Sequence, residues 1–211
     1  MKKHYCNICN VEIPAFDTSA EGVDRCPICR SVARHRAVLK LIQDWSCENP
    51  IHFMLEIGGD GAFFKEQADQ FYTLDSSSSY VNIQGNIENI CFCANVFDVI
   101  LCLDVLEHVE NDYAALVETA RILAPTGKLF LTASCWDKRG PTKKPADAQL
   151  PEFHLSMSGK WDCLCYRYYT EESILKLVTD AGLNCHMHTL NYPNMAINNV
   201  NIFVASKDNL H

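Results

Sequence analysis

From residue 51 onward, short apolar and β-branched runs alternate with segments whose apolar residues recur at helical spacing. Such alternation is typical of a parallel sheet covered by helices on both faces. The pattern predicts strands near 52–57, 70–75, 97–103, 127–134, 183–190 and 199–206, with a short one near 81–84. It predicts helices near 31–45, 62–69, 111–123 and 170–181. A turn-forming stretch at 192–199 separates the last two strands, which are therefore expected to form an antiparallel hairpin.

Several residues mark the expected ends of these helices. Ser31 is placed to cap the first helix, and Asn111 to cap the third. Pro125 and Gly127 are expected to end that third helix, because neither residue continues a helix well.

Chain length and composition indicate one main domain and a small additional unit. A chain of 211 residues can bury one sizeable core and a satellite. The formal net charge is −8, yet residues 1–45 carry seven basic and five acidic side chains, so the N-terminal segment is mildly basic. No apolar run reaches the length of a membrane span, and no signal-like stretch follows the first residues. We expect a cytoplasmic protein with no membrane partner, whose cysteines are metal ligands or reduced core thiols.

Four cysteines near the N-terminus form two C-x-x-C knuckles that are sixteen residues apart. This spacing lets four thiolates surround one tetrahedral zinc ion, and no position is left open for catalysis. The sequence therefore predicts a structural Zn²⁺ site without which this segment does not fold. The predicted ligands are Cys6, Cys9, Cys26 and Cys29.

A basic cluster surrounds the second knuckle and the start of the first helix. It consists of Arg25, Arg30, Arg34, His35 and Arg36. Such a cluster can contact RNA or another polyanion, but a charged, solvated face is the commoner meaning, so nucleic-acid binding is not favoured.

A glycine-rich turn follows the first strand of the body, in the segment Leu55–Gly61. Glycines at such a turn let main-chain N–H groups approach a ligand closely. Asp75 follows nineteen residues after Glu56, at the end of the next strand, where a carboxylate can accept both hydroxyls of a ribose. The turn and the acid together predict a nucleotide-type pocket.

Four segments in order resemble class I S-adenosylmethionine-dependent methyltransferases, particularly the type 11-like branch. They are LEIGGDGA at 55–62, Asp75, FDVILCLDVLEHV at 97–109 and RILAPTGKLFLT at 121–132. The segment CPICRSVARHR at 26–36 is similar to the zinc-knuckle lead of some bacterial members. The resemblance implies an α/β, Rossmann-like, doubly wound sheet of seven strands with an antiparallel last strand.

The resemblance also implies roles for single residues. Glu56 and Gly58 would shape the methionine-binding turn, together with Asp60 and Gly61. Asp75 would bind the ribose hydroxyls, Asn86 and Ile87 would flank the adenine, and Leu103 and Asp104 would line the pocket beneath the sulfonium. Asp60 stands where this turn departs from the family pattern, and its carboxylate either impairs binding or faces the cofactor's ammonium group.

Methyl transfer from a sulfonium mainly requires that donor and acceptor be held in position. Where the acceptor must lose a proton, Asp104 and His108 are the candidate catalytic groups. The segment 135–169 is too long for a simple connection and is the expected lid over the methyl acceptor. Among the residues that it carries are Trp136, His154, Trp161, Tyr166, Tyr168 and Tyr169.

The expected organisation is a zinc-knuckle subdomain at 1–30, a connecting helix at 31–50 and a methyltransferase domain at 51–211. The favoured function is methyl transfer from S-adenosylmethionine to an unidentified small-molecule, saccharide or macromolecular acceptor. One alternative, favoured by Asp60, is a non-catalytic binding or adaptor protein. A second is an RNA methyltransferase that grips its substrate with the basic segment. The sequence leaves the acceptor and the oligomeric state open.

Overall fold

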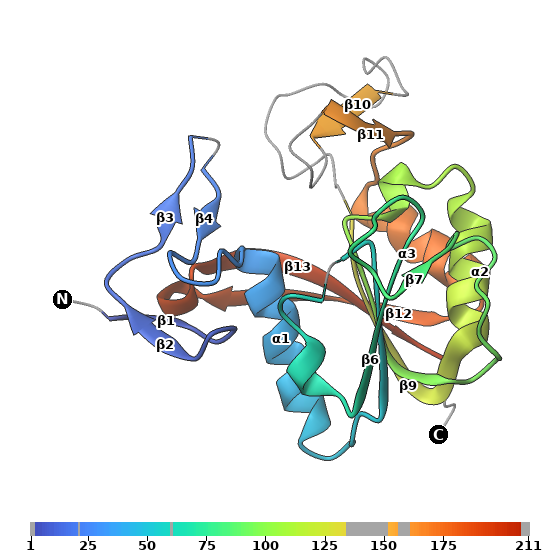
Figure 1. Ribbon diagram of the computed structural model, residues 1–211, viewed down its shortest axis with the longest axis horizontal. Coiled ribbons are helices and arrows are strands. Elements are labelled where there is room, and N and C mark those ends of the chain that lie inside the picture. The colour runs from blue at the N-terminus through green and yellow to red at the C-terminus, as the bar shows by residue number, and fades with distance from the viewer. Residues whose placement is uncertain (1–2, 21, 60, 134–151, 156–160, 208–211) are drawn as a thin grey trace.

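The computed structural model describes residues 3–20, 22–59, 61–133, 152–155 and 161–207. Its centre is a seven-stranded sheet in the order β12-β13-β9-β8-β5-β6-β7 (Figure 1). β13 runs antiparallel to β9 and β12, and the other neighbouring pairs are parallel. The doubly wound sheet and its terminal hairpin are therefore confirmed. The strands are β5 (Phe53–Ile57), β6 (Gln70–Asp75), β7 (Ile83–Gln84), β8 (Phe97–Leu103), β9 (Leu123–Thr132), β12 (Asn184–Tyr192) and β13 (Ile197–Ser206).

Helices cover both faces of this sheet. α1 (Ala33–Ser46) packs on one face, while α2 (Asp112–Ile122) and α3 (Glu171–Asp180) pack on the other (Figure 1). The central strand β8 serves both cores, because its side chains alternate between the two faces. Val99 belongs to the core under α1, and Ile100 belongs to the core under α2 and α3. Burial on both faces explains why β8 reads as a continuous apolar run.

The helix expected near 62–69 is wrong, since the segment holds only the single 3-10 turn η1 (Lys65–Gln67). Gly58 and Gly61 have φ values of 72° and 79°, so the chain leaves β5 in a tight turn rather than a helix. Phe64 is then fully buried against the α1 core. Only a few residues remain before β6 begins, which is too few for a stable helix.

The helix-end predictions have mixed outcomes. Asn111 caps α2 as expected, because its side chain accepts a hydrogen bond of 3.0 Å from the Ala114 N–H. Ser31 is not the cap of α1, since Val32 holds that position. Pro125 and Gly127 do not end α2 either, because the helix ends at Ile122 and both residues lie within β9.

Two smaller units flank the sheet. The described residues of 1–30, here called the head, form the short pairs β1 (His4–Cys6) with β2 (Val11–Ile13) and β3 (Asp17–Thr18) with β4 (Asp24–Arg25). The head lies beside the tip of the β12–β13 hairpin, where η4 (Pro193–Met195) forms the turn (Figure 1). A separate hairpin, β10 (Glu152–Leu155) with β11 (Trp161–Cys165), follows β9 in the chain. Among the described residues, no helix combines the length and hydrophobicity that a bilayer span requires.

Candidate cofactor site and cysteine cluster

The four predicted zinc ligands converge in the head. The sulfur atoms of Cys6, Cys9, Cys26 and Cys29 all lie within 4.8 Å of one another. Two of the separations are 3.6 Å, for Cys6 to Cys29, and 3.7 Å, for Cys9 to Cys26. A tetrahedral zinc with Zn–S bonds of about 2.3 Å places its sulfur atoms about 3.8 Å apart. The cysteine cluster therefore fits one tetrahedral ion.

The two knuckles share a local geometry. Asn10 and Arg30, each of which follows the second cysteine of its knuckle, have φ values of 56° and 63°. This left-handed conformation turns the chain back so that both sulfurs of a knuckle face the same point. Ser31 lies against the cluster, with its hydroxyl 3.4 Å from the Cys6 sulfur and 3.2 Å from the Cys29 sulfur. That contact explains why Ser31 is not a helix cap.

Arg36 fastens the head to the C-terminal hairpin. Its side chain is fully buried, and burial lowers the pKa of its guanidinium. The guanidinium donates hydrogen bonds to four main-chain carbonyls and lies 4.3 Å from the centre of the Phe16 ring. The acceptors are the carbonyls of Ser31, Asp24, Met195 and Ala196. Arg36 therefore belongs to the protein interior and not to a solvated basic face.

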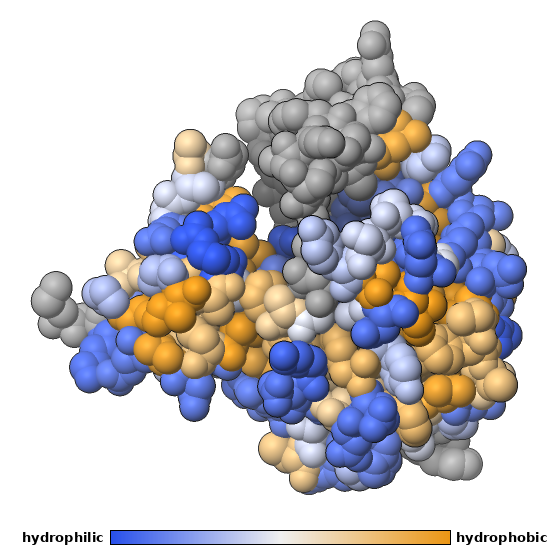
Figure 2. Space-filling model, viewed as in Figure 1, coloured by the Kyte–Doolittle hydropathy of each residue, from blue (hydrophilic) through white to orange (hydrophobic). Residues whose placement is uncertain are grey.

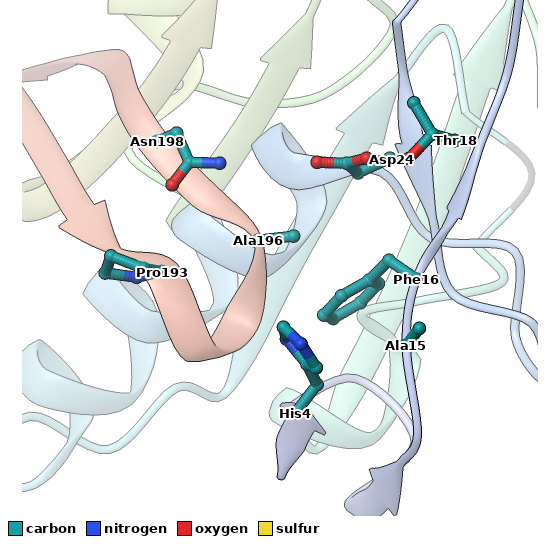
Figure 3. Close-up of a pocket in the computed structure, with 8 residues that line it drawn as sticks. All are labelled: His4, Ala15, Phe16, Thr18, Asp24, Pro193, Ala196 and Asn198. Carbon is teal, nitrogen blue, oxygen red and sulfur yellow. Dashed lines mark hydrogen bonds between the residues drawn. The ribbon is translucent and has the colours of Figure 1, made fainter. Parts of the chain in front are cut away.

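A small cavity of about 230 Å³ lies at this junction (Figure 3). His4, Phe16 and Asp24 line it from the head, and Pro193 and Asn198 line it from the hairpin. The Asp24 carboxylate already accepts a hydrogen bond of 2.7 Å from the Thr18 hydroxyl. None of the residues predicted to bind the cofactor lines this cavity, so it is a feature of the junction.

The glycine turn is built around the Glu56 carboxylate. Glu56 is 7% exposed, and its Oε2 accepts a hydrogen bond of 2.9 Å from the Gly61 N–H. A Cβ at Gly59 would lie 2.3 Å from the Glu56 carboxyl carbon, and one at Gly58 would lie 2.6 Å from a Val105 methyl group. Glycine is therefore required at both positions, and the main chain is left bare as a close-binding turn needs. Asp60 lies outside the described residues.

Asp75 ends β6 on the same edge of the sheet. Its Oδ1 accepts hydrogen bonds from the main-chain N–H groups of Ser77 at 2.7 Å and Ser78 at 2.8 Å. Within the described part of the chain, its hydrogen bonds all reach Oδ1, so Oδ2 remains for a ligand. Beyond β7, the Asn86 side chain accepts from the Glu88 N–H at 2.9 Å, and Ile87 is 5% exposed.

Asp104 follows β8 at the carboxyl edge, beside the glycine turn. Its φ of 56° is unusual for a residue other than glycine, and such strain is concentrated at functional sites. Oδ1 accepts a hydrogen bond of 2.8 Å from the Thr132 hydroxyl, and Oδ2 lies 3.2 Å from Nε of Arg34. Leu103 is the last residue of β8 and pairs with Thr132. The sheet thus brings Asp104 and Leu103 to the edge where Gly58 lies.

His108 lies in the 3-10 turn η2 (Leu106–His108), and its Nδ1 lies 2.8 Å from the Leu164 carbonyl. Because a carbonyl only accepts, Nδ1 donates in this contact. The Tyr166 N–H also donates to the Glu107 carbonyl at 2.8 Å. The described end of the 135–169 segment is therefore anchored on η2, whereas 134–151 and 156–160, with Trp136, lie outside the described residues.

Sequence reasoning did not assign Arg34, His35 or Thr132 to the site. His35 is partly buried, and its ring packs against Phe63, just past the glycine turn, with the ring centroids 4.4 Å apart. Burial, reinforced by the neighbouring arginines, lowers the pKa of His35 to about 3. The sequence shows that Arg34, His35 and Arg36 are adjacent. It does not show which of these side chains is buried or which one faces the cofactor site.

Residues 57–131 match the family model described as a methyltransferase domain. Among curated proteins, none matches this chain in sequence. The central segment of the chain therefore matches a methyltransferase domain family, and the seven-stranded sheet has the fold of solved S-adenosylmethionine-dependent methyltransferases.

Several solved structures share this fold. An amino pentose methyltransferase from Micromonospora echinaspora, solved with S-adenosylmethionine bound, is 14% identical with a TM-score of 0.59, over 85% of this chain and 94% of that one. The 1,6-didemethyltoxoflavin-N1-methyltransferase from Burkholderia thailandensis, solved with S-adenosylhomocysteine, is 16% identical with a TM-score of 0.55, over 83% and 79%. The cyclase SpnF is 13% identical with a TM-score of 0.57, over 98% and 87%. Because SpnF shares it, the fold alone does not specify the reaction.

Proposed function

We propose that the protein is a methyltransferase that transfers the methyl group of S-adenosylmethionine to an acceptor. The observation that carries this proposal is the bare glycine turn over Glu56, flanked on the same sheet edge by Asp75 and Asp104. In open α/β sheets, ligands bind at the carboxyl ends of the strands where the strand order reverses. Here that point lies between β5 and β8.

When bound, S-adenosylmethionine supplies a methyl group that is already activated by the sulfonium. The residues of this chain then act mainly by positioning. Asp75 accepts from the ribose hydroxyls, Asn86 and Ile87 flank the adenine, and Glu56, Gly58 and Gly61 shape the turn, with Asp60 beside them. Leu103 lines the floor beneath the sulfonium.

Two residues are candidates for the acceptor's proton. Asp104 accepts a hydrogen bond from the Thr132 hydroxyl and forms an ion pair with Arg34, which suits a fixed, charged binding group. His108 donates through Nδ1 to Leu164, so Nε2 is the ring nitrogen that can accept a proton. The acceptor is expected beneath the segment 135–169. The end of that segment, which includes β11, contacts η2 and so lies close to His108.

We also propose that the head binds one structural zinc ion through its four cysteines. The sulfur separations fit a tetrahedral ion, and Cys6 and Cys26 are buried. Cysteines that bind a metal rather than pair as disulfides are typical of a reducing compartment, which favours the cytoplasm. We accordingly propose a zinc-binding subdomain at 1–30, a connecting helix at 31–50 and a methyltransferase domain at 51–211.

The alternatives receive unequal support. The RNA hypothesis gains none, because Arg36 is buried, Arg34 is paired with Asp104 and Arg30 is paired with Asp17. The adaptor hypothesis has one specific observation, since Ile28 at the tip of the second knuckle is 57% exposed. Apolar residues cover part of the head surface in Figure 2. A partner of the head is compatible with catalysis in the body.

Isothermal titration of the zinc-loaded protein with S-adenosylmethionine and S-adenosylhomocysteine tests the proposal. We expect both ligands to bind with a stoichiometry of one. If neither ligand binds at millimolar concentration, the methyltransferase proposal is wrong and the adaptor hypothesis stands. Elemental analysis of the purified protein tests the metal, for which one zinc per chain is expected and none in a Cys26→Ser variant.

A further inference from the structure

The start of α1 connects the cysteine cluster directly to the candidate cofactor site. Ser31 lies against two of the cluster's sulfur atoms, at 3.4 Å from Cys6 and 3.2 Å from Cys29. Three residues later, Nε of Arg34 lies 3.2 Å from Oδ2 of Asp104. The short segment 31–34 therefore spans the whole distance between the two sites.

A second contact fixes the same end of the helix. The His35 ring stacks on Phe63 with a centroid distance of 4.4 Å, and Phe63 follows the glycine turn by two residues. The pKa of His35 is lowered to about 3 by burial, so this ring is neutral and packs as a flat, uncharged surface. Arg34 thus ties the start of α1 to the end of β8, through Asp104. His35 ties it to the segment that follows β5, through Phe63.

The charges at this place match those of an amino acid. Arg34 and Asp104 present a guanidinium and a carboxylate side by side, with side chains 38% and 29% exposed. Within the described residues, Arg34 has Asp104 as its one charged partner, so its two terminal NH₂ groups retain donors for a ligand. The methionine end of S-adenosylmethionine carries a carboxylate and an ammonium group, and arginine binds carboxylates through two parallel hydrogen bonds.

We propose that Arg34, held in place by the metal-loaded head, binds the methionine carboxylate of the cofactor while Asp104 binds its ammonium group. Metal in the head consequently raises the affinity of the body for its cofactor. This inference rests on the proposed methyltransferase function, and it gives the head a role in the cofactor site rather than in folding alone.

The head needs its metal to hold this segment because it has almost no core of its own. Its buried apolar cluster consists of Cys6, Ile13 and Cys26, and two of these are metal ligands. Without the ion, the sulfur atoms no longer share a centre, and Ser31 loses the surface on which it rests. Arg34 then loses its fixed position opposite Asp104.

Two ligands separate this role from a general structural one. S-adenosylhomocysteine carries the amino-acid end, whereas 5′-methylthioadenosine has the same adenosine and sulfur but lacks it. By isothermal titration of the zinc-loaded full chain, Arg34→Gln should weaken S-adenosylhomocysteine about tenfold and leave 5′-methylthioadenosine unchanged. Lys40→Gln is the control, because Lys40 is a cation on the same helix that pairs with Asp44, and it should change neither affinity.

Metal removal completes the test. After chelation, the wild-type chain should lose S-adenosylhomocysteine affinity by a similar factor and keep its affinity for 5′-methylthioadenosine, and Arg34→Gln should lose nothing further. The inference is overturned if Arg34→Gln binds S-adenosylhomocysteine like the wild type, if both ligands weaken together in either experiment, or if chelation affects Arg34→Gln as strongly as the wild type. Failure of the underlying function is distinct, because the zinc-loaded wild type would then bind neither ligand.

Discussion

Nε of Arg36 donates a hydrogen bond of 2.7 Å to the main-chain carbonyl of Met195, a residue 159 positions further along the chain. The same guanidinium reaches three other carbonyls, two of them in or beside the head and one in the hairpin. The guanidinium is planar and carries five N–H donors, so one side chain can donate to carbonyls of the head and of the hairpin at the same time. The docking of the head on the sheet depends on this side chain.

Arg36→Met should therefore destabilise the protein by about 3 kcal/mol or more, because it leaves several buried carbonyls without a donor. Chemical denaturation of the zinc-loaded variant would measure the loss in the free energy of unfolding. Arg25→Gln serves as the control, since Arg25 is exposed, and it should change the free energy by less than about 0.5 kcal/mol. Equal stability of Arg36→Met and the wild type would contradict the docking described here.

Gly59→Ala should abolish cofactor binding. A Cβ at this position would lie 2.3 Å from the Glu56 carboxyl carbon and would displace the carboxylate that holds the Gly61 N–H. Gly85→Ala is the matched control, because a Cβ there would meet its nearest atom, on Leu74, at an ordinary 3.7 Å. Titration with S-adenosylhomocysteine should detect binding in the control alone, and equal binding in both variants would refute this account of the turn.

Asp75→Asn should separate loop stability from ribose binding. The asparagine keeps an Oδ1 for the Ser77 and Ser78 N–H groups but replaces the second oxygen by a donor. We expect an unchanged melting temperature and an affinity for S-adenosylhomocysteine that is about tenfold weaker or worse. Asp75→Ala should lose both, and unchanged affinity in either variant would show that the ribose lies elsewhere.

His35 should make the protein less stable in acid. Its pKa is about 3 in the folded state, below its ordinary value of 6.5, so the unfolded chain binds a proton first as the pH falls. The stability that the protein gains from keeping His35 neutral is fully present above pH 6.5. It is lost as the pH falls from 6.5 to about 3, at about 1.4 kcal/mol per pH unit.

His35→Leu removes this titration while keeping an apolar contact with Phe63. The free energies of unfolding of the two proteins should converge, or reverse in order, as the pH falls from 7 to 4. Acid also releases metal from thiolates, but that loss is common to both proteins and cancels in the difference. A difference that is independent of pH would show that the histidine is not held neutral.

The strands could be predicted because burial on two faces leaves a direct mark on the sequence. β8 is a continuous apolar run, and the turn-forming residues at 192–199 predict the β12–β13 hairpin. The helix predicted at 62–69 failed because Phe63 and Phe64 have the spacing of a helix face but are fixed by contacts made in three dimensions. Their partners are His35 and the α1 core.

The cysteine cluster was predictable because its ligand spacing is local, and the structure brings the four sulfurs together. The roles of Arg34 and Arg36 were not predictable, since both appear as charges in one basic run. One is buried beneath the hairpin and the other faces Asp104, and both partners are distant in sequence. The residues expected around the cofactor lie on one sheet edge, and their contacts with it remain predictions.

The clamp made by Arg36 also sets an order of events during synthesis. The head is synthesised before the hairpin, and the carbonyl of Met195 that accepts from Arg36 is made 159 residues after Arg36. At ordinary rates of translation this interval is on the order of ten seconds. The head therefore remains undocked for that interval, and any ion that binds during it must be held by the four cysteines without support from the hairpin.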